Sequence, residues 1–87
     1  MPSLVKWAVE SLSSLKVEEA AAQFIELLKD ELPGIRWVAA VVLGRIGRGS
    51  AEAAAGLRGS LQDADGDVRE AAAWALSQVE RAAPNRV

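Results

Sequence analysis

The chain has 87 residues, ten of them basic and twelve acidic, so its net charge is −2. This length fits a single domain, and the charge does not suggest a surface that neutralises many phosphates or lies on an anionic membrane. Cysteine and histidine are absent, which excludes disulfides, thiolate zinc sites and His-based triads, so we expect no catalytic residue, no cofactor and no metal site.

The first half of the chain predicts three helices. The first begins after Ser3, a suitable N-cap, and its apolar residues recur at helical spacing at Leu4, Ala8, Leu12 and Leu15. The second covers residues 20–28 and ends before Pro33, which suits the first turn of the next helix. The third covers residues 35–46 and ends at Gly47.

The second half predicts two more helices. Ser50 caps a fourth helix that runs to about residue 62. Asp67 and Glu70 form a capping box that opens the fifth, which runs to about residue 82. No segment alternates between apolar and polar residues over a useful length, so we expect no strands.

The sequence repeats itself at a shift of 33 positions. This shift aligns the pairs Asp30/Asp63, Ile35/Val68, Arg36/Arg69, Ala39/Ala72, Leu43/Leu76 and Ile46/Val79. A shift of 31 relates the first helix to the third. We therefore predict one domain over residues 1–87, built from about two and a half units at 3–31, 34–64 and 67–82.

Two segments carry a family resemblance. Residues 63–76 read DADGDVREAAAWAL, and residues 30–47 read DELPGIRWVAAVVLGRIG. Each places an acidic residue before a Val-Arg or Ile-Arg pair, an alanine-rich stretch and a closing leucine. This pattern resembles the short HEAT-like repeat of phycobilisome lyase subunits and of many bacterial and archaeal adaptor proteins. The resemblance implies an all-α fold, a right-handed α-solenoid of about five stacked helices.

The same resemblance implies roles for two pairs of residues and for the whole chain. Asp30 with Arg36, and Asp63 with Arg69, correspond to a structural ladder of acceptors and guanidinium donors along the stack. The chain would be a non-catalytic scaffold that binds a partner protein or itself. The alternative is a small relative or fragment of a phycobilin lyase/isomerase subunit that handles a tetrapyrrole, although full lyase subunits are several times longer. Small-molecule binding is otherwise not expected.

The resemblance also implies that the second helix of each unit lines a concave face that contacts partners. The outward positions are Glu19, Gln23, Glu26 and Lys29 on one helix, and Glu52, Gly56, Gly59 and Gln62 on the other. Glycine costs about 1 kcal/mol relative to alanine inside a helix. Two explanations are open for Gly56 and Gly59. They either form a shallow groove for a partner helix or strand, or result from neutral sequence drift in a helix of low stability.

Three apolar residues lie on the same side of the first helices of two successive units, the helices predicted over residues 35–46 and 67–82. Trp37, Val41 and Trp74 fall outside the register that fills the buried face, so we expect them to point outward on the convex side. An apolar patch of this kind usually marks an interface, and a symmetric homodimer is the favoured form. The alternatives are that the tail 82–87 covers the indoles or that the twist of the stack tucks one between helices.

Two further motifs have simpler explanations. Residues 63–67 read DADGD, but glycine is fourth and Trp74 is twelfth, unlike a calcium loop, so we predict a turn. Arg45, Arg48 and Arg58 are candidates for a small basic patch, and nucleic-acid binding is disfavoured because Glu52 should lie near them.

Neither a signal peptide nor a membrane span is expected. Lys6 interrupts the N-terminal apolar stretch, which differs from a secretory signal. The longest apolar run, residues 37–43, falls far short of the ~20 residues needed to cross a bilayer. We expect a cytoplasmic protein with no membrane partner.

Overall fold

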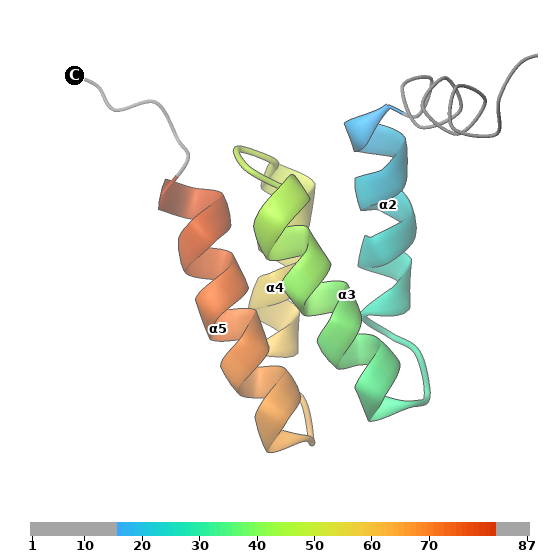
Figure 1. Ribbon diagram of the computed structural model, residues 1–87. Helices are drawn as coiled ribbons and strands as arrows, with labels where there is room; N and C mark the ends of the chain where they lie inside the picture. Colours follow the sequence, from blue (N-terminus) through green and yellow to red (C-terminus); the bar gives the residue numbers. More distant parts are fainter. Residues whose placement is uncertain (1–15, 82–87) are drawn as a thin grey trace, which may run out of the picture.

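The computed structural model describes residues 16–81, which form four α-helices (Figure 1). The helices are α2 (Val17–Leu27), α3 (Pro33–Ile46), α4 (Ala51–Ser60) and α5 (Gly66–Arg81). No residue between 16 and 81 lies in a strand, so the all-helical class is confirmed for this part of the chain. Of the five predicted helices, the one over residues 4–15 lies outside the described residues.

The helices follow the repeat of the sequence. α3 and α5 lie side by side across the front of Figure 1, and α4 lies behind them. α2 packs against α3 and also contacts α4, which in turn packs against α5. α3 and α5 begin at Pro33 and Gly66, 33 residues apart, and α2 and α4 end at Leu27 and Ser60, again 33 apart. Helices that are related by the repeat are thus neighbours in space.

Local side-chain chemistry sets where the helices begin. Pro33 is the first residue of α3, as predicted, because its missing N–H would be unpaired there in any case. The Ser50 hydroxyl oxygen accepts a hydrogen bond of 3.0 Å from the N–H of Ala53, so the predicted cap of α4 is also confirmed.

The predicted cap of α5 is wrong by two residues. Asp65, not Asp67, caps this helix: its Oδ1 accepts hydrogen bonds from the N–H of Asp67 at 2.8 Å and of Val68 at 3.0 Å. The physical reason is that α5 begins at Gly66, which moves the N-cap position back to Asp65 and leaves Asp67 inside the first turn.

The core combines small residues with a few large ones. The fully buried large side chains are Leu43, Leu57, Val68 and Val79. Leu43, Leu57 and Val79 form one cluster with buried alanines from all four helices, whose small side chains permit close approach of the helix axes. Ile46, Leu61 and Leu76 are half-buried at its edge.

Ile35 departs from the predicted buried register. It is 37% exposed, whereas Val68, its equivalent in the repeat, is fully buried. α5 packs against both α3 and α4. Among the described residues, α3 has no neighbour that corresponds to what α3 is for α5, so the same repeat position has a different environment.

Gly44 lies at a close contact between α3 and α5. A Cβ atom at this position would lie 2.6 Å from Cζ3 of Trp74 and 2.9 Å from the Cα of Ala75. Real Cβ atoms do not approach other atoms so closely, and the backbone of α5 cannot move away without loss of core packing. Glycine is therefore required here by the space between the helices.

We predict that Gly44→Ala lowers the free energy of unfolding by about 1–3 kcal/mol, because the added methyl group forces α3 and α5 apart. Urea denaturation followed by circular dichroism measures the change. Gly34→Ala is the matched control, since a Cβ at residue 34 meets nothing within 4 Å, and its stability should equal or slightly exceed that of the parent. Equal stability of the Gly44→Ala variant and the parent would contradict the proposed steric role.

Candidate interaction surfaces

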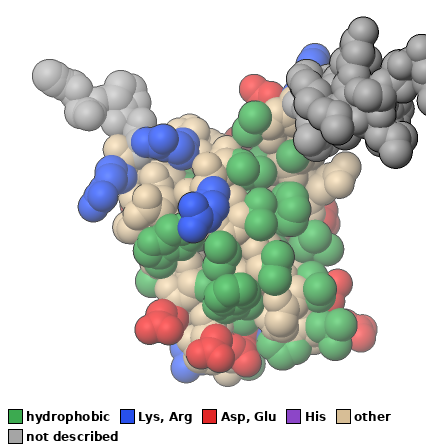
Figure 2. Space-filling model, viewed as in Figure 1, with side chains coloured by type: hydrophobic (Ala, Val, Ile, Leu, Met, Phe, Trp, Pro, Cys, Tyr) green, Lys and Arg blue, Asp and Glu red, His purple; other side chains and the backbone are tan. Residues whose placement is uncertain are grey.

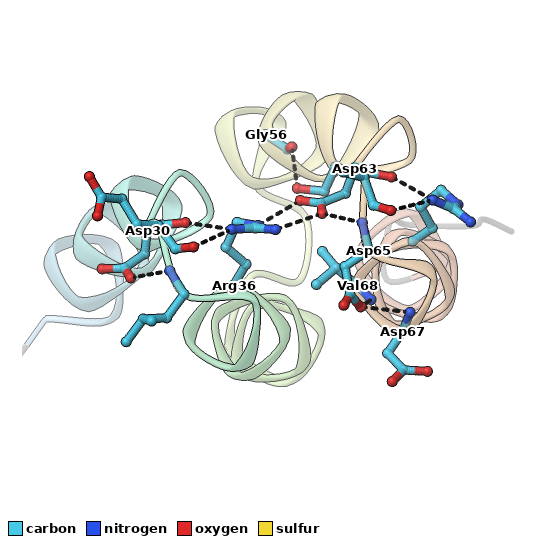
Figure 3. A network of polar contacts seen from close by, with 12 residues as sticks. Asp30, Arg36, Gly56, Asp63, Asp65, Asp67 and Val68 are labelled. Carbon is cyan, nitrogen blue, oxygen red and sulfur yellow. Dashed lines mark hydrogen bonds and ion pairs between the residues drawn. The ribbon is translucent and has the colours of Figure 1, made fainter.

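Arg36 joins two successive interhelical turns (Figure 3). Its Nε donates to Oδ2 of Asp63 at 2.8 Å, and its second terminal nitrogen, Nη2, donates to Oδ1 at 3.0 Å. Nη1 donates to the backbone carbonyls of Asp30 at 2.8 Å and Glu31 at 3.0 Å. One side chain thus binds its own turn through backbone oxygens and the next turn through a carboxylate. This two-pronged geometry is specific to arginine.

Arg69 repeats half of this arrangement one unit later. Its Nη1 donates to the carbonyls of Asp63 at 2.7 Å and Ala64 at 3.2 Å. The carboxylates of Asp30 and Asp63 each accept an N–H from the residue two positions on, at 2.9 Å. The structural ladder that the resemblance implies is present. The turn after Asp63 is shorter than predicted, because residues 66 and 67 already belong to α5. The carboxylates of Asp30 and Asp63 bind N–H groups inside the turns, and Asp65 binds those at the helix start.

The contact with Arg36 changes the acidity of Asp63. The hydrogen bonds from the guanidinium favour the charged carboxylate and lower the pKa of Asp63 below its ordinary value of 3.8, although burial alone would raise it. Only 10% of the Asp63 side chain is exposed. Because the folded state binds this proton less readily than the unfolded state, the ion pair contributes its full stability above about pH 4. That contribution is lost as the pH falls through the lowered pKa of Asp63.

We therefore predict that Arg36→Met makes the free energy of unfolding less dependent on pH below about pH 4. The parent should lose stability steeply below about pH 4, and the variant, already weaker at neutral pH, should lose less. Urea midpoints measured from pH 7 to pH 2 provide the comparison. Arg69→Met is the matched control: within residues 16–81 Arg69 donates only to backbone carbonyls, and its charge lowers the pKa of Asp63 less than the hydrogen bonds from Arg36 do, so its loss should leave most of the steep decline in place. An identical acid slope in the Arg36→Met variant and the parent would show that the prediction is wrong.

The two tryptophans of α3 and α5 lie at the surface. Trp37 is 44% exposed and Trp74 is 40% exposed, so their predicted outward orientation is confirmed. Val41 was expected to point outward as well, but it is half-buried, because its side chain packs against the core between the helices. The alternative in which residues 82–87 cover the indoles falls outside the described residues.

The indoles border a shallow hollow of about 300 Å³ between α3 and α5. It is lined by Trp37, Val41, Arg45, Glu70, Ala71 and Trp74, which we call the indole face. The Arg45 guanidinium lies 5.8 Å from the centroid of the Trp74 ring, within the range of a cation–π contact. Figure 2 shows hydrophobic side chains gathered over the helices of this side, with acidic side chains below them and basic side chains above on the left.

The sequence analysis grouped Arg45 with Arg48 and Arg58 and not with the tryptophans. Arg45, Arg48 and Arg58, the candidates for a basic patch, have three different surroundings. Arg45 lies on the indole face, Arg58 forms an ion pair with Glu80 of α5, and Arg48 borders a hollow beside the start of α2. The helical spacing of Trp37, Val41 and Arg45 could have revealed that the arginine shares the stripe of the indole.

The second candidate surface lies between α2 and α4. A hollow of about 570 Å³ brings together three predicted site residues, Glu52, Gly56 and Gly59, with Lys29. The other predicted positions, Glu19, Gln23, Glu26 and Gln62, are exposed but do not line it. Ile25 and Leu28 line it and were not predicted, although their spacing on the helix could have suggested an apolar floor.

The two glycines of α4 have different surroundings. A Cβ at Gly56 would lie 3.1 Å from Cδ1 of Leu28 and 3.4 Å from Cγ2 of Ile25, whereas a Cβ at Gly59 would meet nothing within 4 Å. Gly56, expected to be an outward position, is therefore half-buried under α2. The close approach that Gly56 allows is therefore made by Ile25 and Leu28 of the same chain, not by a partner.

We predict that Gly59→Ala raises the free energy of unfolding by roughly 0.5–1 kcal/mol, since alanine removes the helix cost of glycine without a contact. Gly56→Ala should gain less, because Leu28 has to shift to make room. Urea denaturation of both variants measures this difference. A larger gain at Gly56 than at Gly59 would contradict the packing described for α2 and α4.

Residues 16–81 contain neither a cluster of metal-ligating side chains nor a membrane-spanning helix. No group of three or more acidic side chains in this range is arranged to hold a metal ion. Among the same residues, no helix is both long enough and apolar enough to cross a membrane.

Comparison with known families agrees with the repeat geometry. The family model described as HEAT repeats matches residues 2–77, most of the chain. The chain therefore belongs to the HEAT-repeat family, whose paired helices stack so that each unit contacts its neighbours. Neither a curated protein nor a solved structure shows a match to the chain.

Proposed function

We propose that this HEAT-repeat chain is a non-catalytic module that binds another protein through the indole face. HEAT repeats generally mediate protein–protein interaction. The observation that carries the proposal is the exposure of two indoles, Trp37 and Trp74, on adjacent helices around one hollow. Polar or charged residues would ordinarily occupy such positions on a surface.

The energetics of indole burial favour an interface at this position. Tryptophan is enriched at the energetic centres of protein interfaces, where it is surrounded by residues that exclude water. On the indole face, Arg45 and Glu70 form a charged rim around the apolar centre. A partner that covers this centre removes the exposed parts of both rings from water at little cost in conformational entropy, because the rings are already held against α3 and α5.

The hollow between α2 and α4 is a second surface for the same function. Its floor is apolar, formed by Ile25 and Leu28, and Lys29 and Glu52 supply charge at its edge. In this proposal Glu19, Gln23, Glu26 and Gln62 are exposed residues that surround the contact. The indole face ranks first because the close packing of α2 over Gly56 already fills part of the second surface.

Site-specific photo-cross-linking tests which surface is used. A photoreactive phenylalanine analogue replaces Trp37 on the indole face, Gln23 on α2, or Ala64 in an exposed turn as the control. We expect a discrete protein adduct from position 37 in cells that produce the chain, and none from position 64. Excess unmodified chain should suppress the adduct, and the Trp37→Glu/Trp74→Glu variant should not. An adduct from position 23 alone, or none from any position, would overturn the proposal for the indole face.

The finer resemblance to phycobilisome lyase subunits supplies the alternative function. In that case the chain would handle a tetrapyrrole, and a bilin added to the purified chain should show a red-shifted absorption band. A shifted band that disappears when Trp37 or Trp74 is replaced by glutamate would assign the indole face to the pigment. The absence of any shift would leave protein binding as the remaining proposal.

A further inference from the structure

We infer that the partner of the indole face is a second copy of this chain, bound about a two-fold axis so that Arg45 of each copy contacts Glu70 of the other. This inference rests on the proposed function, because it uses the same surface. It adds the identity of the partner and the relative orientation of the two copies.

The first support is the order of charges along the face. Four exposed residues lie on one stripe of α5. They are Asp67 and Glu70 near its start, Trp74 near its middle and Arg81 at its end. On α3, Trp37 is followed by Val41 and then by Arg45 near the end of the helix. The face therefore changes from acidic through apolar to basic along the direction that both helices share, as Figure 2 also shows.

The second support is that the charges of two copies are complementary only when their helices run in opposite directions. A two-fold axis that lies in the plane of the interface, at right angles to the helices, turns the second indole face toward the first and reverses the direction of its helices. The acidic end of each copy then meets the basic end of the other, and the apolar centres meet each other. Interfaces of this kind use the same patch twice and form a closed dimer. A parallel arrangement would oppose like charges, which disfavours it.

The third support is that, within the described residues, Arg45 and Glu70 form no ion pair. The ion pairs among residues 16–81 are Arg36–Asp63 and Arg58–Glu80, and neither involves the indole face. Arg45 is held over the ring of Trp74 rather than by a carboxylate. Both Arg45 and Glu70 are exposed, so each can contact a charge on a second molecule without the loss of an existing ion pair.

The dimer should be weak and reversible. Two indoles that are each less than half exposed provide a small apolar centre, and small interfaces lie at the low end of the size range for stable complexes. We expect a dissociation constant in roughly the micromolar range. Higher salt should weaken the dimer, because the rim charges are screened.

The test is a charge exchange measured by sedimentation equilibrium. Arg45→Glu alone opposes glutamates at both rim contacts, and Glu70→Arg alone opposes arginines, so each should weaken the dimer by roughly tenfold or more. An equimolar mixture of the two variants should dimerise as the parent does, because both contacts in the mixed dimer then join a glutamate to an arginine. The double variant Arg45→Glu/Glu70→Arg should also recover. Circular dichroism and urea midpoints serve as folding controls.

Several outcomes would overturn the inference. They are a parent that stays monomeric at high micromolar concentration, single variants that dimerise like the parent, and a mixture that does not recover. A monomeric parent whose position 37 still cross-links to a different protein would overturn only the identity of the partner. A parent without self-association and without any adduct at position 37 would overturn the proposed function as well.

Discussion

Two helices of the same layer, α3 and α5, approach each other where only very small residues fit between them. Gly44 lies against the backbone of Ala75, and a single added carbon atom would come within 2.9 Å of the Ala75 Cα. An indole cannot enter a seam of this width. Trp74 therefore lies across the top of the seam, with its Cζ3 atom over Gly44, and 40% of the residue remains exposed. The same narrow contact that stabilises the stack thus places a large apolar side chain on the surface.

The guanidinium of Arg36 determines how α3 and α5 are matched along their length. It binds its own turn through two carbonyl oxygens and the next turn through the carboxylate of Asp63. The starts of α3 and α5 are consequently held at the same level. Trp37 and Glu70 occupy the same position of the repeat, and Val41 and Trp74 share the position one helical turn further on. The alignment of the two helices therefore creates the order of acidic, apolar and basic residues on the indole face.

The features that could be predicted from the sequence depend on the period of the repeat. The helices and the outward indoles follow from residues 33 positions apart and from the 3.6-residue turn, and the Asp–Arg ladder follows from the resemblance to HEAT-like repeats. The features that were missed depend on neighbours in space. Ile35 and Val68 share a repeat position but not an environment. Asp65 replaces Asp67 as cap because α5 starts two residues earlier than expected. Gly56 is covered by Leu28, which follows the end of α2. Arg45 was assigned to a basic patch because its contact with Trp74 crosses between two helices.

Quenching of tryptophan fluorescence by acrylamide, followed over protein concentration, examines the indole face most directly. Trp7→Phe removes the third indole of the chain, so that only Trp37 and Trp74 report. At low concentration the emission should be red-shifted and readily quenched, and it should shift to the blue and become protected as the protein is concentrated. Emission that is already blue-shifted and protected at the lowest concentration would contradict an exposed binding face, because it would place both indoles in the core.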